Sequence, residues 1–105
     1  MSVIDDLFAT VLLRRSGDPS TSYVAALTGK GRAKIAQKVG EEAVETALAA
    51  VSGDRTQVAA ESADLLFHLC VLWADCGLTP QDVYAVLEQR QGQSGLAEKA
   101  ARPSS

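Results

Sequence analysis

Residues 38–45 read KVGEEAVE, a stretch in which a glycine interrupts a helical pattern and three glutamates fall within five positions. Glycine inside a helix costs roughly 1 kcal/mol relative to alanine, and neighbouring carboxylates repel one another. On a helix, Glu41 and Glu45 share a narrow stripe with two upstream lysines, and Glu42 lies on its flank. Apolar residues border the stripe on both sides, so this is not an ordinary surface helix with a wide polar face.

A second helical segment, residues 55–76, carries acids in an unusual setting. Apolar residues surround its axis, so we expect most of this helix to be buried. Glu61, Asp64 and His68 nevertheless lie within roughly 60° of one another on its surface, and Asp75 continues their line. Carboxylates are almost never fully buried unless they are paired or bound to metal. We therefore expect the two helices to face each other with their acids lining a shallow groove.

The facing acids predict a divalent cation. Glu41, Glu42 and Glu45 would meet Glu61 and Asp64 across the groove. Five carboxylates at close range cannot all be ionised without a cation between them. Because every donor is an oxygen, the expected ion is Mg²⁺, with Mn²⁺ as a second candidate, rather than zinc.

Basic residues just upstream of the acids indicate which ligand the cation would bind together with the protein. The bases in this stretch, with no acid among them, are Lys30, Arg32, Lys34 and Lys38. Mg²⁺ keeps several waters and shares its shell with phosphate oxygens. Metal and lysines together therefore predict a site for a polyphosphate. On this hypothesis the glutamates are ligands, and Gly40 lets a helix or a substrate approach the backbone beside them.

Each residue also has a structural interpretation. The glutamates could form a solvated face that pairs with Lys38 at helical spacing. Gly40 could mark a close helix crossing, and Lys34 with Lys38 could be an ordinary surface pair. We expect His68 to form a hydrogen bond in the core, or to hydrogen-bond to a residue that binds the metal, and not to bind the metal directly. Glu61 and Asp64 inside an apolar helix shift the balance towards a metal site.

The rest of the chain is helical in pattern, with no alternating strand pattern and no internal repeat. Ser2 with Asp5 forms a capping box, and Thr79-Pro80-Gln81-Asp82 is a strong helix start. We expect helices after Ser2, over about 33–51, over 55–76 and from Pro80 to near Gly92, with a short turn over 22–27 that TGKG breaks. These form a single all-α domain over residues 1–92, followed by a mobile or ligand-dependent tail over 93–105.

Composition excludes several functions. The formal net charge is -3 and only 5% of residues are aromatic, so we expect no nucleic-acid partner. The N-terminus has no long apolar run, which predicts neither a signal peptide nor a membrane span. Cys70 and Cys76 are six apart, a spacing that suits neither an intrahelical disulfide nor a metal site. We expect two reduced, buried thiols in a cytoplasmic protein.

The chain resembles the phosphoribosyl-ATP pyrophosphatases, which belong to the all-α nucleoside-triphosphate pyrophosphatase (MazG-like) superfamily. The superfamily resemblance lies in E-E-x-x-E at 41–45 followed by E-x-x-D at 61–64. The narrower resemblance lies in three stretches: SYVAALTGKGRAKIAQKVGEEAVE, ADLLFHLCVLWADCGLTPQDVYAVL and SGLAEKAAR.

This resemblance implies a reaction and an assembly. The reaction is the second step of histidine biosynthesis, in which phosphoribosyl-ATP and water give phosphoribosyl-AMP and pyrophosphate. The assembly is a homodimer or larger homo-oligomer in which a second subunit completes the helical bundle. On the side of the helix over 55–76 that faces away from its acids, Leu66, Cys70 and Trp73 lie near one another. We expect part of that surface to meet the other subunit.

The resemblance also assigns roles to individual residues. It implies metal binding by Glu42, Glu45, Glu61 and Asp64. Lys34 and Lys38 would hold phosphates, and Glu41 would be an added ligand or a base that positions water. We take Glu41 and Glu45 as the candidate catalytic residues.

Three other functions compete with this one. A housecleaning pyrophosphatase would use the same acids on a non-canonical or deoxy nucleotide. A ferritin-like metal bundle needs Glu-x-x-His motifs, whereas His68 follows Asp64 by four positions and Glu61 by seven. A non-catalytic helical interaction module would show no dependence of stability on metal.

Overall fold

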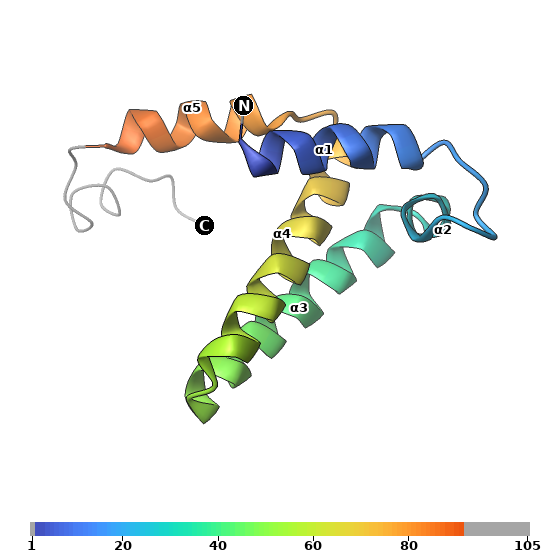
Figure 1. Ribbon diagram of the computed structural model, residues 1–105. Helices are drawn as coiled ribbons and strands as arrows, with labels where there is room; N and C mark the ends of the chain where they lie inside the picture. Colours follow the sequence, from blue (N-terminus) through green and yellow to red (C-terminus); the bar gives the residue numbers. More distant parts are fainter. Residues whose placement is uncertain (1, 92–105) are drawn as a thin grey trace.

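The computed structural model describes residues 2–91, which form five helices and no strand. The all-α prediction is therefore confirmed, and Figure 1 shows the arrangement. In chain order the helices are α1 (Val3–Arg14), α2 (Tyr23–Lys30), α3 (Arg32–Ser52), α4 (Arg55–Cys76) and α5 (Pro80–Arg90). The predicted tail over 93–105 lies outside the described residues.

The helices begin where local capping chemistry places them. The Ser2 hydroxyl accepts from the Asp5 backbone N–H while the Asp5 carboxylate accepts from the Ser2 backbone N–H. Thr79 and Asp82 form the same reciprocal box at α5, with a proline in the first turn. These caps satisfy amide groups that have no partner within the helix. Both predicted helix starts are confirmed.

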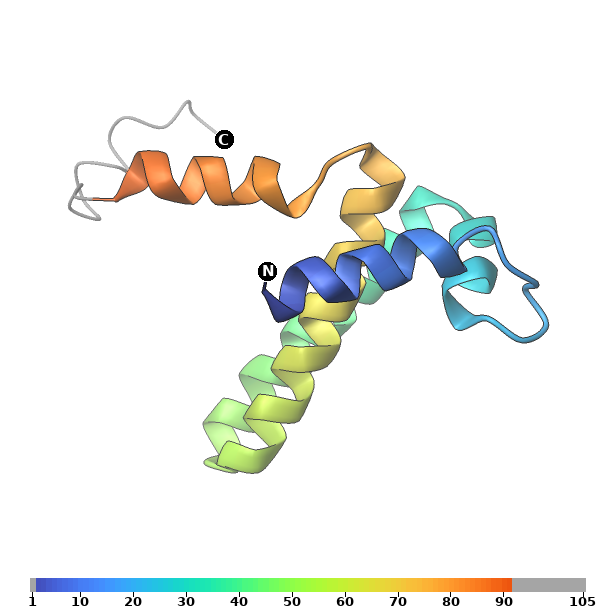
Figure 2. The same ribbon diagram turned by 45° about the horizontal axis from the view of Figure 1, so that its top comes forward.

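The two long helices, α3 and α4, form an antiparallel hairpin. Gly53 ends α3 at a φ of 81°, a left-handed conformation that favours glycine, and the Asp54 side chain caps α4 by accepting from the Gln57 N–H. Figures 1 and 2 show the hairpin projecting away from α1 and α5. This tight connection places the acids of α3 opposite those of α4.

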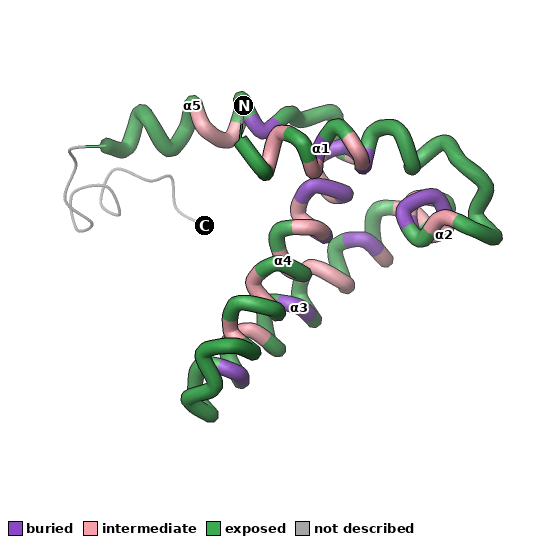
Figure 3. Tube along the Cα trace, viewed as in Figure 1, coloured by how far each residue is buried: buried purple, intermediate pink, exposed green. Residues whose placement is uncertain are grey.

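The core lies at one end of the hairpin, where α1 and α2 pack against it. Figure 3 shows buried residues concentrated there, while the far half of the hairpin is mostly exposed. The prediction that most of α4 is buried is therefore wrong for residues 2–91 of a single chain, because no third helix in that range covers the far half. The core cluster consists of Phe8, Val11, Val24, Leu27, Ile35, Cys70, Val71 and Ala74.

The second helix runs further than its pattern predicts. It continues through Gly29 to Lys30 instead of ending at Leu27. A glycine costs a helix only about 1 kcal/mol, and tertiary packing of Val24 and Leu27 offsets this. The break comes at Gly31, whose φ of 96° an L side chain rarely adopts.

One prediction about the α4 cysteines is wrong. Of the three residues whose surface was expected to meet another subunit in part, Cys70 is 0% exposed inside the chain's own core. Trp73 is partly buried against the same core, so only Leu66 is exposed. Both cysteines are free as expected, but Cys76 is exposed rather than buried.

Within residues 2–91, no single helix is both long and apolar enough to cross a membrane. Only α4 and α5 taken together reach that length and composition, and they are bent by 107° at their junction.

Candidate metal and phosphate site

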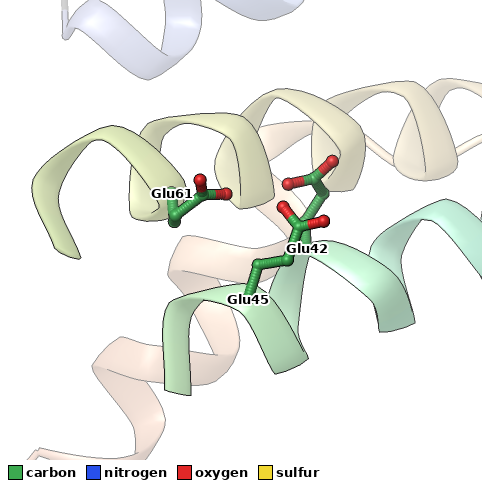
Figure 4. A group of neighbouring side chains, drawn as sticks. All are labelled: Glu42, Glu45 and Glu61. Atoms are coloured by element: carbon green, nitrogen blue, oxygen red, sulfur yellow. The ribbon is translucent and has the colours of Figure 1, made fainter. Parts of the chain in front are cut away.

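The hairpin brings three glutamates together. Glu42 and Glu45 come from adjacent turns of α3, and Glu61 comes from the facing turn of α4 (Figure 4). Each offers one carboxylate oxygen, and these oxygens all lie within 4.8 Å of one another. We call Glu42, Glu45 and Glu61 the glutamate cluster.

Two oxygens of the glutamate cluster are buried without a partner. Glu42 is only 8% exposed, and Oε2 of Glu42 and Oε2 of Glu61 have no hydrogen bond among the described residues. Leaving a buried polar atom unpaired costs about 1–3 kcal/mol, and more for a charged group. A hard divalent cation prefers carboxylate oxygens and would pair with both. The residues present therefore fit the metal that the sequence predicts.

The other oxygens of the cluster have polar neighbours. Gln57 Nε2 donates to Glu61 Oε1 at 2.8 Å. Lys38 Nζ lies 3.9 Å from Glu42 Oε1, one turn away along α3. These contacts engage one oxygen of Glu42 and one of Glu61, and the second oxygen of each has no hydrogen-bond partner among the described residues.

Two predicted members stand apart from the cluster. Asp64 is exposed, and its carboxylate does not belong to the group whose oxygens converge. Glu41 is exposed on the other side of Lys38, which it contacts at 3.4 Å. Its Oε2 also accepts from Gln37 Nε2 at 2.9 Å. The Gln37 hydrogen bond, aided by Lys38, holds the pKa of the Glu41 carboxyl below its ordinary value, so Glu41 is ionised at neutral pH.

Gly40 has open space beside it. A Cβ atom built there would meet no atom within 4 Å among the described residues. The close crossing of another helix of the same chain is therefore excluded for residues 2–91. Approach of a substrate or of a second subunit stays a prediction.

Lysines gather in a cavity next to the cluster. This cavity, which we call the lysine cavity, has a volume of about 260 Å³. Lys30 from the end of α2 lines it together with Lys34 and Lys38 from α3, and Tyr23 and Glu41 complete its polar lining. The pKa of Lys38 is raised by the nearby Tyr23 and then by Glu41, so this lysine is cationic over the whole neutral range.

Arg32 and Asp75 take no part in either group. The Arg32 Nε donates to the Asp75 carboxylate at 2.8 Å, and a second guanidinium nitrogen donates to the Asp75 backbone carbonyl at 2.9 Å. This pair joins the start of α3 to the end of α4. Arg32 was one of the four bases noted upstream of the acids, and Asp75 was expected to continue the acidic line, but in the structure the two residues pair with each other.

His68 is buried and both of its ring nitrogens have partners. Nδ1 lies 2.8 Å from the Asp64 backbone carbonyl, and Nε2 lies 2.9 Å from the Tyr23 hydroxyl. A carbonyl oxygen can only accept, so Nδ1 carries the proton and the Tyr23 hydroxyl donates to Nε2. His68 thus connects α4 beside Asp64 to the wall of the lysine cavity.

Sequence reasoning did not single out Tyr23. Its neighbour Ser22 caps α2 by accepting from the Ala25 N–H. No local signal reveals that Tyr23 meets His68, because the two residues lie 45 positions apart. The contact exists only because α2 packs across α4.

Fold and site together define a class of protein. Over the described residues it is an all-α protein in which two facing helices bring three carboxylates together beside a cavity lined by three lysines. Comparison with known proteins then narrows the class. Residues 4–91 match the family model described as phosphoribosyl-ATP pyrophosphohydrolase. The chain belongs to this family.

Individual relatives agree over nearly the whole chain. A phosphoribosyl-ATP pyrophosphatase of Azospirillum brasilense is 61% identical over 103 residues, which cover 98% of this chain and 93% of the relative. One of Rhizorhabdus wittichii is 63% identical over 100 residues, covering 95% and 94%. One of Gluconobacter oxydans is 54% identical over 101 residues, covering 96% and 76%.

Proposed function

We propose that this chain hydrolyses phosphoribosyl-ATP to phosphoribosyl-AMP and pyrophosphate, a step of histidine biosynthesis. The observation that carries this function is the family match over residues 4–91, together with relatives of the same name at 54–63% identity. The glutamate cluster beside the lysine cavity supplies the groups that the reaction needs. Cleavage of a phosphoric anhydride depends mostly on positioning and charge neutralisation.

We assign Mg²⁺, with Mn²⁺ as a substitute, to Glu42, Glu45 and Glu61. The two unpaired buried oxygens support this assignment. We add Asp64 as a fourth ligand because it lies one turn along α4 from Glu61. When bound, the cation supplies charge neutralisation for the phosphates and polarises the anhydride.

The lysines and Glu41 act on the substrate itself. Lys34 and Lys38 bind the phosphates in the lysine cavity, which both line. Glu41 lines the same cavity and is held ionised by Gln37 and Lys38. It can therefore accept a proton from the attacking water. Glu45 is the most exposed acid of the cluster and is the second candidate for this role.

We propose a homodimer in which the far half of the hairpin is covered by a second copy. Val44, Leu48 and Val51 are 58%, 63% and 87% exposed, and their spacing places them on one face of α3. Leu66 on α4 is 38% exposed. Burial of such a surface adds roughly 25 cal/mol per Å² of apolar area, and a two-fold interface covers both copies at once.

We also propose a cytoplasmic location. The support is that both cysteines are free, as is usual for proteins in a reducing compartment.

The reaction is tested by incubating the chain with phosphoribosyl-ATP and Mg²⁺ and following the products by ³¹P NMR. We expect stoichiometric pyrophosphate, and none when EDTA replaces Mg²⁺. ATP, dCTP and dUTP serve as comparison substrates. Early orthophosphate would exclude the mechanism, and equal turnover of the deoxynucleotides would favour the housecleaning alternative.

A further inference from the structure

A second, larger cavity also has Tyr23 in its wall. It has a volume of about 610 Å³ and lies between α1, the start of α2 and α4, and we call it the α1–α2 cavity. Thr10 and Arg14 of α1 line it together with Tyr23 of α2 and Phe67 of α4. Its volume falls within the range of small-molecule sites, roughly 300–1,000 Å³.

Tyr23 is common to the walls of this cavity and of the lysine cavity. Its ring stacks on Phe67 with centroids 6.1 Å apart and meets the edge of His68 at 5.7 Å. Its hydroxyl donates to His68 Nε2 at 2.9 Å. These contacts fix the ring although Tyr23 is 51% exposed. The exposed aromatic surface can stack on a nucleobase.

Arg14 places a cation in the α1–α2 cavity. Among residues 2–91 its guanidinium has neither a hydrogen bond nor an ion pair, whereas Arg15 donates to the Ala74 backbone carbonyl at 2.8 Å. An arginine fork matches the oxygens of a phosphate. The two cavities thus share the Tyr23 ring in their walls, and each is lined by at least one cationic side chain.

We propose that the α1–α2 cavity binds the phosphoribosyl group of the substrate, with Arg14 on its phosphate and Tyr23 between that group and the polyphosphate in the lysine cavity. This inference rests on the proposed function, since phosphoribosyl-ATP carries phosphate at two separate ends. An ordinary nucleoside triphosphate has only one such end. Arg14 is then the residue that selects phosphoribosyl-ATP over ATP.

The experiment compares the binding of phosphoribosyl-AMP and of AMP by calorimetric titration in Mg²⁺, which needs no turnover. We expect the wild-type chain to bind phosphoribosyl-AMP about 10- to 100-fold more tightly, the range of a hydrogen bond to a charged group. Arg14→Gln should bring the ratio close to one and leave the affinity for AMP unchanged. Arg14→Lys keeps the charge and should retain part of the preference.

A matched control removes the same charge elsewhere. Arg55 is exposed at the start of α4, at the far tip of the hairpin, so Arg55→Gln should leave both affinities unchanged. Lys34→Ala should weaken both ligands alike, because Lys34 lines the lysine cavity that takes the phosphate they share.

Two results would overturn the inference: a wild-type chain that binds both ligands equally, or a preference that persists in both Arg14 variants. The proposed function is judged separately by the release of pyrophosphate. A chain that turns over phosphoribosyl-ATP with an unchanged preference in Arg14→Gln refutes the subsite alone. A chain with an Arg14-dependent preference and no turnover refutes the reaction alone.

Discussion

The effect of Glu42→Gln on stability should reverse in sign when Mg²⁺ is added. In the glutamate cluster, Glu42 faces two other carboxylates within 4.8 Å and one ammonium at 3.9 Å. At an effective dielectric of about 20, each repulsion costs about 3.5 kcal/mol and the attraction to Lys38 returns about 4 kcal/mol. The balance is an unfavourable interaction of about 3 kcal/mol, before screening.

Solvent screens this net repulsion and reduces its energy, because Glu45 is exposed. We therefore expect Glu42→Gln to raise the free energy of unfolding in EDTA by about 1 kcal/mol, which is about 4–8 °C in Tm for a domain of this size. In Mg²⁺ at a hundred times the dissociation constant, the wild-type chain gains about 2.7 kcal/mol. The glutamine variant lacks one ligand and forgoes most of this gain, so it becomes the less stable protein.

Thermal melts by circular dichroism, at one fixed protein concentration, measure both arms of this prediction. Glu88→Gln is the matched control, because it makes the same chemical change at an exposed position on α5 and should behave alike in both buffers. A wild-type Tm that Mg²⁺ does not move, or a variant that shifts in the same direction in both buffers, would refute the metal assignment.

Four further outcomes follow from the same structure. Asp64→Ala should abolish turnover while leaving the helical circular dichroism intact, and near-normal pyrophosphate release in saturating Mg²⁺ would remove Asp64 from the ligand set. Leu66→Asp should disrupt the proposed dimer and its activity together, as measured by light scattering, and a stable, active wild-type monomer at micromolar concentration would contradict the assembly. Gly40→Ala should raise the free energy of unfolding by up to about 1 kcal/mol, and should lower activity because the added methyl group fills the space open to substrate or partner. Burial raises the pKa of the Cys70 thiol, so the native chain should react with iodoacetamide at Cys76 alone. Its stability should fall as the pH rises past the ordinary thiol pKa, where the unfolded chain loses the Cys70 proton first; modification of both thiols in the native state would contradict the buried position.

The sequence by itself determined the local features of this protein. Serine, threonine and aspartate caps define where α1, α4 and α5 begin, because their side chains bond to amides two or three residues away. Helical spacing likewise placed acids on the facing sides of α3 and α4, since that spacing depends only on the geometry of one helix. Family-specific motifs over residues 22–102 carried the resemblance to a pyrophosphatase.

Only the tertiary structure decided which of these side chains meet. The carboxylate of Glu61 lies close to those of Glu42 and Glu45, whereas that of Asp64 is not part of this group. The rotation and crossing angle of the two packed helices determine the position of each carboxylate. Arg32 pairs with Asp75 across 43 positions, and Tyr23 reaches His68 across 45. Such contacts depend on the distances between separate helices. Those distances arise from the packing of the whole core, and no local pattern in the sequence encodes them.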